Sequence, residues 1–255
     1  MRFPNEMGPV ERHLRAALEG GPLHLTLIDP EKSPGDRAAA VARAAAAAGT
    51  FGILLGGSTG ITRELMGKAA AAIRKAANVP TIIFPEGPGS LAPEADAVLF
   101  MSLLNSRNLD LVVRAHARAA PAVRAMGLEA IPMGYVVVAP GMRVGEVGEV
   151  DPVPREEPSV AAGYALAAEM LGMRLVYLEA GSGAPDPVPP ALVTAVRQAI
   201  RVPLIVGGGI RSADDARPLL EAGADILVTG TVAEEEGVGE SFRAIVREVR
   251  RARTR

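Results

Sequence analysis

The chain has 255 residues, a net charge of −2 and no cysteine. This length suits one large domain or two small ones, and the near-neutral charge gives no reason to expect nucleic-acid binding. Without cysteine, disulfides and thiolate chemistry are excluded, and three histidines do not favour a multi-histidine metal site. Neither a signal peptide nor an apolar run of membrane-spanning length stands out, so we expect a cytoplasmic enzyme-sized protein.

Short apolar runs alternate along the chain with Ala- and Arg-rich segments. A leading helix is expected over 10–19, ended by Gly20 and Gly21. Strand-like runs follow at 23–28, 51–55, 81–84, 97–101, 131–138, 175–178, 204–206 and 226–228. Helices are expected at 36–48, 62–77, 109–126, 159–171, 190–200, 213–221 and 239–253. Continuously apolar strands indicate a parallel sheet covered by helices.

Eight strand signals in 255 residues predict a single-domain (β/α)₈ TIM barrel over 1–255 with a short N-terminal helix. A doubly wound sheet is the alternative, less favoured because loops with chemical character follow strands throughout the chain rather than at one switch point. The interval 87–96 has room for only a short helix or loop. The segment 142–158, rich in Gly, Glu and Pro, is either a mobile flap or a long surface connection.

Glycine dominates the loops after the last three predicted strands. They read Gly181-Ser182-Gly183, Gly207-Gly208-Gly209 and Gly230-Thr231. Loops after strands seven and eight of such barrels often bind phosphate through backbone N–H groups, and glycine lets the backbone approach closely. Turn geometry alone would also explain each loop, but two of them at the right pair of strands favour phosphate.

Carboxylates and hydroxyls follow other strands. Asp29 ends the first strand, where it is placed to hold a hard cation or to act as a base, and Lys32 is placed to pair with phosphate. Ser58 and Thr59 follow the second strand, and a hydroxyl beside a carboxylate is a common Mg²⁺ donor set. Helix capping and a surface ion pair are the structural alternatives.

The fourth strand leads into Asn105, Ser106 and Arg107, which are candidate donors to a second phosphate group or caps of the next helix. His24 lies in mid-strand and is expected to be a packed barrel residue. His13 and His116 fall on predicted helices and are expected to be peripheral.

The order of these motifs resembles the geranylgeranylglyceryl phosphate synthase family. The resemblance covers about 23–235, and it is carried by the runs 24–32 (HLTLIDPEK), 56–58 (GGS), 100–106 (FMSLLNS), 177–183 (YLEAGSG), 207–210 (GGGI) and 229–231 (TGT). It implies a Mg²⁺-dependent prenyltransferase of ether-lipid biosynthesis. Such an enzyme joins sn-glycerol 1-phosphate to geranylgeranyl diphosphate and releases diphosphate. Homodimers or hexamers and transient membrane contact are further implications.

Carried over by residue, the resemblance implies a Mg²⁺ site at Asp29 and Ser58. It assigns Glu179 and Tyr177 to catalysis, and Lys32, Asn105 and Ser106 are candidate diphosphate contacts. The implied glycerol phosphate site comprises Tyr177, Leu178, Glu179, Ala180, Gly181, Ser182, Gly183, Gly208, Gly209, Gly230 and Thr231.

Two positions depart from relatives. Bacterial members that make heptaprenylglyceryl phosphate have Lys two residues before the first-strand Asp, where this chain has Leu27, so the archaeal-type second group is favoured. Glu86 follows Pro85 where the family reads Gly, so Glu86 either points away from diphosphate or helps to hold the metal. The other functions considered are a phosphate-binding isomerase or cyclase of amino-acid biosynthesis, and a non-catalytic barrel that binds a phosphorylated metabolite.

Overall fold

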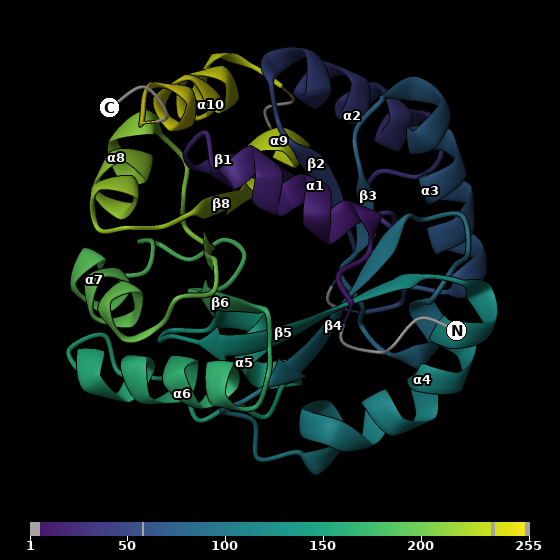
Figure 1. Ribbon diagram of the computed structural model, residues 1–255. Helices are drawn as coiled ribbons and strands as arrows, with labels where there is room; N and C mark the ends of the chain where they lie inside the picture. The colour runs from purple at the N-terminus through teal and green to yellow at the C-terminus, as the bar shows by residue number, and fades with distance from the viewer. Residues whose placement is uncertain (1–5, 58, 236–237, 253–255) are drawn as a thin grey trace.

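The chain forms a closed eight-stranded parallel barrel ringed by helices, as the computed structural model in Figure 1 shows. The structure describes residues 6–57, 59–235 and 238–252. Each strand pairs with the next along the chain, and β8 pairs back with β1. The prediction of a (β/α)₈ barrel is therefore confirmed, and the doubly wound alternative is wrong.

The expected elements are present with boundaries shifted by a few residues. The strands are β1 (Leu23–Ile28), β2 (Gly52–Leu55), β3 (Thr81–Ile83), β4 (Ala97–Leu103), β5 (Glu129–Val137), β6 (Leu175–Glu179), β7 (Leu204–Gly207) and β8 (Ile226–Thr229). The α-helices are α1 (Pro9–Leu18), α2 (Asp36–Ala48), α3 (Arg63–Ala76), α4 (Ala115–Met126), α5 (Met142–Val147), α6 (Pro158–Met170), α7 (Pro190–Ala199), α8 (Ala213–Glu221), α9 (Thr231–Glu235) and α10 (Glu240–Ala252).

Strand side chains alternate between two apolar layers, because successive residues of a strand point to opposite faces. The inner layer fills the barrel and includes Leu25, Leu54 and Tyr177. The outer layer lies between the strands and the helices and includes Ile53 and Leu178. A residue's place in the alternation therefore decides whether it faces the barrel interior.

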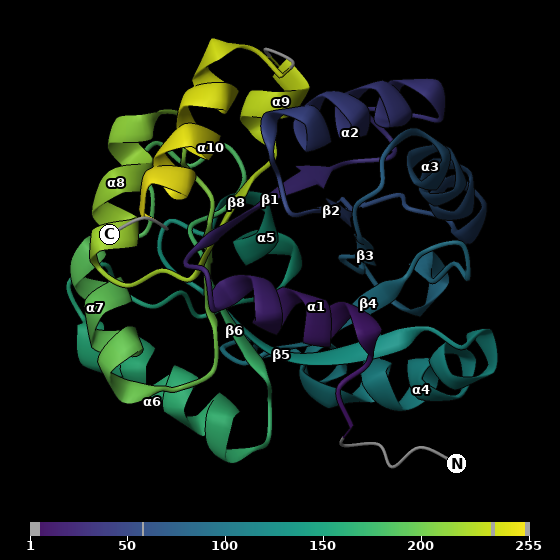
Figure 2. The same cartoon turned by 45° about the horizontal axis from the view of Figure 1, so that its top comes forward.

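Helix α1 closes the amino end of the barrel, and both ribbon views show it lying across this opening (Figures 1 and 2). Its side chains Val10 and Leu14 join the inner apolar layer. The carboxylate of Glu129, at the start of β5, accepts the backbone N–H groups of Val10 and Glu11, each at 2.8 Å. Glu129 thus satisfies donors that the first turn of a helix leaves without intrahelical partners.

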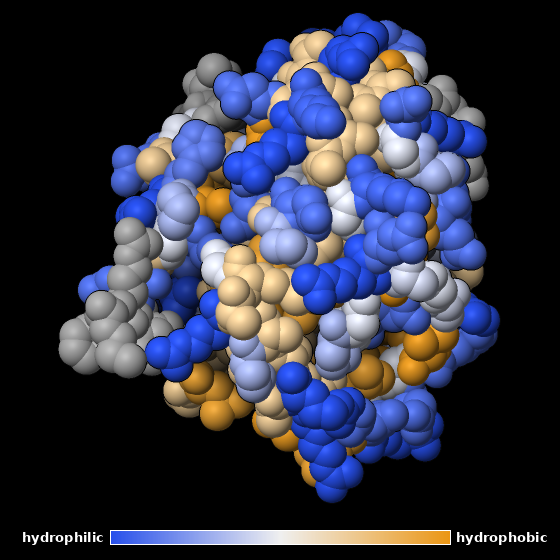
Figure 3. Space-filling model, turned by 90° about the vertical axis from the view of Figure 1, so that its right-hand side faces the viewer, coloured by the Kyte–Doolittle hydropathy of each residue, from blue (hydrophilic) through white to orange (hydrophobic). Residues whose placement is uncertain are grey.

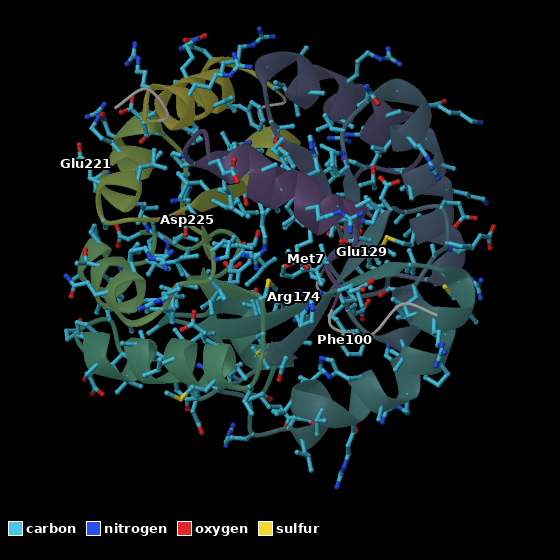
Figure 4. The ribbon with its side chains drawn as sticks, in the orientation of Figure 1. Met7, Phe100, Glu129, Arg174, Glu221 and Asp225 are labelled. Carbon is cyan, nitrogen blue, oxygen red and sulfur yellow. The ribbon has the colours of Figure 1, made fainter. Side chains whose placement is uncertain are left out.

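A buried ion pair fixes the same helix. Glu11 is fully buried, and its carboxylate meets Nε of Arg174 at 2.7 Å and Nε of Arg15 at 3.1 Å. Arg174 and Glu129 are labelled beside α1 in Figure 4. The amino end of the barrel is therefore closed by a fixed helix, and in barrels of this type the functional site lies at the opposite, carboxyl end of the strands.

Three regions differ from expectation or add detail to it. The helix expected over 109–126 begins as a π-helical turn, η2 (Asp110–Arg114), and continues as α4. The segment 142–158 contains α5 and is held by isolated bridges from Ser106 to Val150 and from Val138 to Val153. The interval 87–96 holds only the 3₁₀ turn η1 (Pro88–Ser90), as expected, so no long helix covers the barrel between β3 and β4.

The histidine expectations are confirmed in part. His24 is buried between β1 and α10, and its two ring nitrogens each lie 3.0 Å from a threonine hydroxyl, of Thr50 and of Thr229. Burial lowers the pKa of His24 to about 3, so the ring is neutral. His13 is exposed and stacks on Phe51.

Within 6–57, 59–235 and 238–252, no helix is long and apolar enough to cross a bilayer. Figure 3 shows the side that carries α3 and α4, where hydrophilic side chains surround small hydrophobic areas in the lower part.

Candidate active site

Two cavities meet at the carboxyl end of the barrel. The smaller is polar and lies over β6, β7 and β8, where it is lined by Leu27, Tyr177, Glu179, Ser182, Gly208, Gly209, Ile210, Arg211, Val228, Thr229, Gly230 and Thr231. The larger is apolar, has a volume of about 190 Å³ and extends over β3 and β4 toward α4. Glu179, Leu27 and Ser182 line both cavities, so these three residues mark the junction.

Glu179 is the last residue of β6 and is almost fully buried, with 7% of its surface exposed. One carboxylate oxygen, Oε1, accepts the backbone N–H of Gly181 at 2.7 Å. The other, Oε2, accepts the hydroxyl of Tyr135 at 3.1 Å. Burial raises the pKa of Glu179, while the hydrogen bonds from Gly181, Tyr177 and Tyr135 oppose this rise because they favour the charged form.

Tyr135 is a residue of the site that the sequence analysis missed. Strand register places Tyr135 of β5 directly beside Tyr177 of β6, and Val137 beside Glu179. The rings of Tyr135, Tyr177 and Phe84 pack edge to face, with centroids 5.1 to 5.8 Å apart. Burial raises the pKa of both tyrosines well above the ordinary value, so both remain protonated donors.

Gly207 makes room for the Tyr177 hydroxyl. A Cβ placed on Gly207, the last residue of β7, would collide with Oη of Tyr177. The position therefore requires glycine for a close approach of side chain to backbone. A tyrosine buried in the inner layer thereby reaches the floor of the polar cavity.

The glycine loops form the walls of the polar cavity. Gly208 and Gly209 have φ of 82° and 74°, a left-handed conformation that favours glycine. A Cβ on Gly208 would lie 2.6 Å from the backbone nitrogen of Gly181, so the loops after β6 and β7 touch. The hydroxyls of Ser182 and Thr231, 3.2 Å apart, join the loop after β6 to α9.

Two residues expected to bind substrate face away from the cavity. Leu178 and Ala180 are fully buried in the outer layer, among the helices. Neighbours along a strand point to opposite faces, so Leu178 and Ala180 point outward where Tyr177 and Glu179 point inward. Their side chains therefore do not line the polar cavity, and Ala180 donates its backbone N–H to the carbonyl oxygen of Gly207 at 3.1 Å, so contact with substrate at these two positions stays a prediction.

Arg211 adds a positive charge that the sequence analysis missed. It lines the polar cavity, and its guanidinium donates to the carbonyl oxygens of Pro185 at 3.0 Å and Gly183 at 3.1 Å. It also follows the Gly207–Ile210 run by one position. An arginine directly after a glycine loop of this kind is a signal for anion binding that the sequence does contain.

Asp29 lies at the barrel mouth, one residue beyond the end of β1. Its carboxylate accepts the backbone N–H of Glu31 at 3.0 Å and lies 3.8 Å from Nζ of Lys32. A Cβ on Gly57 would lie 2.7 Å from Oδ1 of Asp29, so Asp29 packs on the loop after β2. Ser58, the second expected metal ligand, lies outside the described residues.

Glu86 has a structural role in this loop. Its carboxylate accepts the backbone N–H groups of Ile61 at 2.9 Å and Gly60 at 3.3 Å. It therefore ties the loop after β3 to the loop after β2, which carries Gly57. These two bonds partly balance the negative charge that Glu86 adds to the wall of the apolar cavity.

Asn105 and Ser106 are committed to the fold. The buried amide of Asn105 donates to the carbonyl oxygens of Val137 at 2.8 Å and Asp151 at 2.9 Å, and it accepts the N–H of Val137 at 3.1 Å. Ser106 donates to the carbonyl of Gly148 at 2.6 Å and accepts the N–H of Asn108 at 3.0 Å. The expectation of diphosphate contacts at both residues is corrected, because these groups position α5.

The apolar cavity lies where no long helix covers the barrel wall. Apart from the junction residues, it is lined mainly by apolar groups from the loop after β3, from β4, η2, α4 and α5, including Phe84, Pro85, Leu91, Val98, Leu99, Phe100, Met101, Leu103, Leu111, Ala119, Val123, Val144 and Val147. His116 also lines it, so the expectation that His116 is peripheral is wrong. Its Nε2 donates to the carbonyl of Met101 at 2.6 Å, and burial lowers its pKa.

The fold and the site define a class: (β/α)₈-barrel proteins in which a polar and an apolar cavity share one buried carboxylate. Among the described residues, no group of three or more His, Cys, Asp or Glu could hold a metal ion. The chain belongs to the PcrB family, whose family model matches residues 15–249.

Similar proteins from several archaea are named geranylgeranylglyceryl phosphate synthase. The chain is 53% identical to the geranylgeranylglyceryl phosphate synthase of Methanothrix thermoacetophila, over 91% of this chain and 92% of the relative. It is 47% identical to that of Thermococcus gammatolerans, over 96% and 97%. The resemblance identified from the motifs is confirmed.

A solved structure is similar throughout. It is the (S)-3-O-geranylgeranylglyceryl phosphate synthase of Thermoplasma acidophilum in complex with its substrate sn-glycerol-1-phosphate. The TM-score is 0.91 at 45% sequence identity, covering 96% of this chain and 100% of the other. The whole barrel is thus shared with a protein of that name.

Proposed function

We propose that this protein is a prenyltransferase that joins sn-glycerol 1-phosphate to geranylgeranyl diphosphate, giving 3-O-geranylgeranylglyceryl 1-phosphate and diphosphate. The observation that carries the proposal is that Glu179 lies in the walls of both the polar and the apolar cavity. A carboxylate at this junction can accept the proton of a hydroxyl held on one side while an allylic carbon lies on the other. The names of the relatives and the ligand of the similar structure agree with this reaction.

The polar cavity suits glycerol phosphate. Glycine backbone at Gly208, Gly209 and Gly230 can approach phosphate oxygens, and Thr231 begins α9 at the cavity wall. Arg211 adds a cation on the same wall. The phosphate would thus lie at the loops after β7 and β8, with the glycerol directed toward Tyr177 and Glu179.

The apolar cavity suits the prenyl chain. Its lining is mostly hydrocarbon, with a few polar side chains such as Glu86 and His116, and transfer of apolar surface from water into such a lining is favourable. His116 does not place a charge there, because its lowered pKa keeps the ring neutral. The diphosphate end would lie at the mouth, near Glu179.

Glu179 would remove the proton of the attacking hydroxyl. Its raised pKa makes it a stronger base than an exposed glutamate, and Tyr177 and Tyr135 hold its carboxylate in place. The hydroxyl oxygen then forms a bond to the allylic carbon as the bond from that carbon to diphosphate breaks. Binding both substrates beside one carboxylate makes the attack intramolecular in effect, which lowers the entropic part of the barrier.

Magnesium is part of the proposal. Asp29 at the mouth supplies the hard oxygen donor that Mg²⁺ prefers, and Ser58 follows Gly57 on the loop against which Asp29 packs. Sites of this kind use one or two carboxylates together with substrate phosphates, so a larger protein cluster is not required. When bound there, the cation would supply positive charge for the departing diphosphate.

The two other functions fit the site less well. An isomerase or cyclase of amino-acid biosynthesis needs a paired acid and base, and among the described residues that line the polar cavity only Glu179 is acidic. A barrel that only binds a phosphorylated metabolite has no use for an apolar cavity whose lining includes Glu179.

The test is incubation of the protein with Mg²⁺, radiolabelled sn-glycerol 1-phosphate and prenyl diphosphates of several lengths. We expect a butanol-extractable product, and its absence with every prenyl length would overturn the proposal. Glu179→Gln should still bind glycerol phosphate but lose most turnover, whereas Asp29→Ala should lose the Mg²⁺-dependent rate. An unchanged rate in either variant would remove that residue from its assigned role.

A further inference from the structure

Helix α5 lies over the barrel mouth and is fixed at its first residues. Figure 2 shows it inside the ring of outer helices. A Cβ on Gly181 would lie 2.6 Å from the carbonyl oxygen of Gly141 and 2.7 Å from Cβ of Met142. The start of α5 therefore packs directly on the loop that follows Glu179.

The other end of α5 is held by β4 and the residues after it. Ser106 donates to the carbonyl of Gly148, and the Asn105 amide links Val137, before the helix, to Asp151, after it. Asn108 adds a bond to the Glu149 carboxylate at 2.7 Å. Since both ends are fixed, the backbone of α5 has a defined position relative to the junction.

Arg143 is the second residue of α5 and lines the apolar cavity together with Glu179 and Ser182. Among the described residues that line this cavity, it is the single Lys or Arg. Arg143, an exposed residue, thus adds a positive charge to a largely hydrocarbon cavity whose lining also includes the proton acceptor Glu179. A cation in such a cavity suits a ligand that has an anionic head group and an apolar chain.

Other cations near the mouth have identified partners of their own. Arg211 lies in the polar cavity and binds the carbonyls of Pro185 and Gly183. Arg155 binds the carbonyls of Ala139 and Pro187. Arg143, by its place in the apolar cavity, is the arginine best situated for the head group of the prenyl donor.

We propose that Arg143 binds the diphosphate of the prenyl donor and stabilises it as it leaves; this inference rests on the proposed function. When the bond from the allylic carbon to the diphosphate oxygen breaks, its electron pair stays on diphosphate, and the hydroxyl oxygen of glycerol phosphate bonds to that carbon. The hydroxyl proton passes to Glu179. Guanidinium donors fit phosphate oxygens in bidentate geometry, so Arg143 replaces the donors that Asn105 and Ser106 do not supply.

The experiment compares Arg143→Gln and Arg143→Lys with Arg114→Gln. Arg114 is exposed at the end of the π-helical turn η2 and does not line the cavity, so it is a control for loss of one exposed positive charge. Steady-state kinetics would be measured for both substrates, and binding of inorganic diphosphate with Mg²⁺ would be measured by calorimetry. Circular dichroism would check that each variant folds.

Arg143→Gln should reduce kcat/KM for the prenyl diphosphate by about 10- to 100-fold, as for a charged hydrogen bond, and weaken diphosphate binding. The KM for glycerol phosphate should stay within about twofold, Arg143→Lys should recover part of the loss, and Arg114→Gln should match wild type. Kinetics and diphosphate binding of Arg143→Gln equal to those of Arg114→Gln would overturn the inference while the wild-type activity stands. An inactive wild type would instead refute the proposed function.

Discussion

The hydroxyl of Tyr135 donates to Oε2 of Glu179 at 3.1 Å, across neighbouring strands β5 and β6. The two residues are 44 positions apart in the chain and meet only because Tyr135 is in register with Tyr177. This contact holds the carboxylate in place, and it also lowers the pKa of Glu179 against the rise caused by burial. The basicity of the proposed proton acceptor, which burial raises most, is therefore adjusted in part by a residue outside its own loop.

Tyr135→Phe should move the acid limb of the pH–rate profile upward. The lost hydrogen bond favoured the charged form, so its removal raises the pKa of Glu179 further, and a higher pH is needed to deprotonate the carboxylate. The measurement is kcat/KM from pH 5 to 9, with Tyr164→Phe on α6, outside both cavities, as the control. A Tyr135→Phe profile that coincides with wild type would show that this contact does not tune Glu179.

Gly207→Ala should impair activity by displacing Tyr177. The new Cβ would collide with the Tyr177 hydroxyl, which packs against buried rings and has little room to move. We expect the free energy of unfolding to fall by about 1–3 kcal/mol, which is typical of overpacking. The free energy of glycerol phosphate binding should weaken by more than this. Calorimetric binding and thermal unfolding measure the two effects.

The matched control is Gly163→Ala on α6, where a Cβ would meet nothing within 4 Å. This change should leave activity intact and stabilise the helix by about 0.5–1 kcal/mol. If Gly207→Ala bound glycerol phosphate as tightly as Gly163→Ala, the close approach of Gly207 and Tyr177 would have no role in the site.

Arg174→Met should destabilise the barrel at the end opposite the site. Glu11 is fully buried, and removal of Arg174 leaves its carboxylate with Arg15 as the remaining ion-pair partner among those identified. Breaking a buried ion pair costs about 3–5 kcal/mol of unfolding free energy. Because Arg15 still pairs with Glu11, we expect a loss near the lower value. Chemical denaturation gives the free energy of unfolding.

Lys68→Met is the exposed counterpart, because Lys68 and Glu64 form an i,i+4 pair on the surface of α3. Exposed pairs contribute about 0.2–1 kcal/mol, so this variant should remain close to wild type. Equal losses in the two variants would contradict the role of burial.

Stability should fall as the solution is acidified through the ordinary pKa of histidine. Burial lowers the pKa of His24 in the folded protein from 6.5 to about 3, so the unfolded chain binds the proton more readily between these values. The contribution is fully present above pH 6.5 and is lost at up to about 1.4 kcal/mol per pH unit as the pH drops toward 3. The free energy of unfolding, measured at pH 7 and pH 4.5, should change less with pH in His24→Gln than in wild type. Identical slopes would assign the acid sensitivity to other groups.

The sequence by itself determined the barrel, the order of its elements and most of its polar mouth. Apolar runs at eight places and helical segments between them leave few other packings for a parallel sheet. Strands in a parallel barrel end on one face, so Asp29, Glu179 and the glycine loops had to share that face. Strand alternation also predicts that the side chains of Leu178 and Ala180 point outward when those of Tyr177 and Glu179 point inward.

Only the tertiary structure decided which side chains are committed to the fold and which are left for ligands. Asn105 and Ser106 were chemically suitable donors, yet their partners lie 32 to 46 residues away in the segments that hold α5. Tyr135, Arg143 and His116 reach the cavities through strand register and the placement of α5 and α4. Hydrogen-bonding capacity is local in sequence, whereas its satisfaction depends on what packing brings within about 3 Å. For this reason, the site predicted from residue types differs from the site observed in the folded protein.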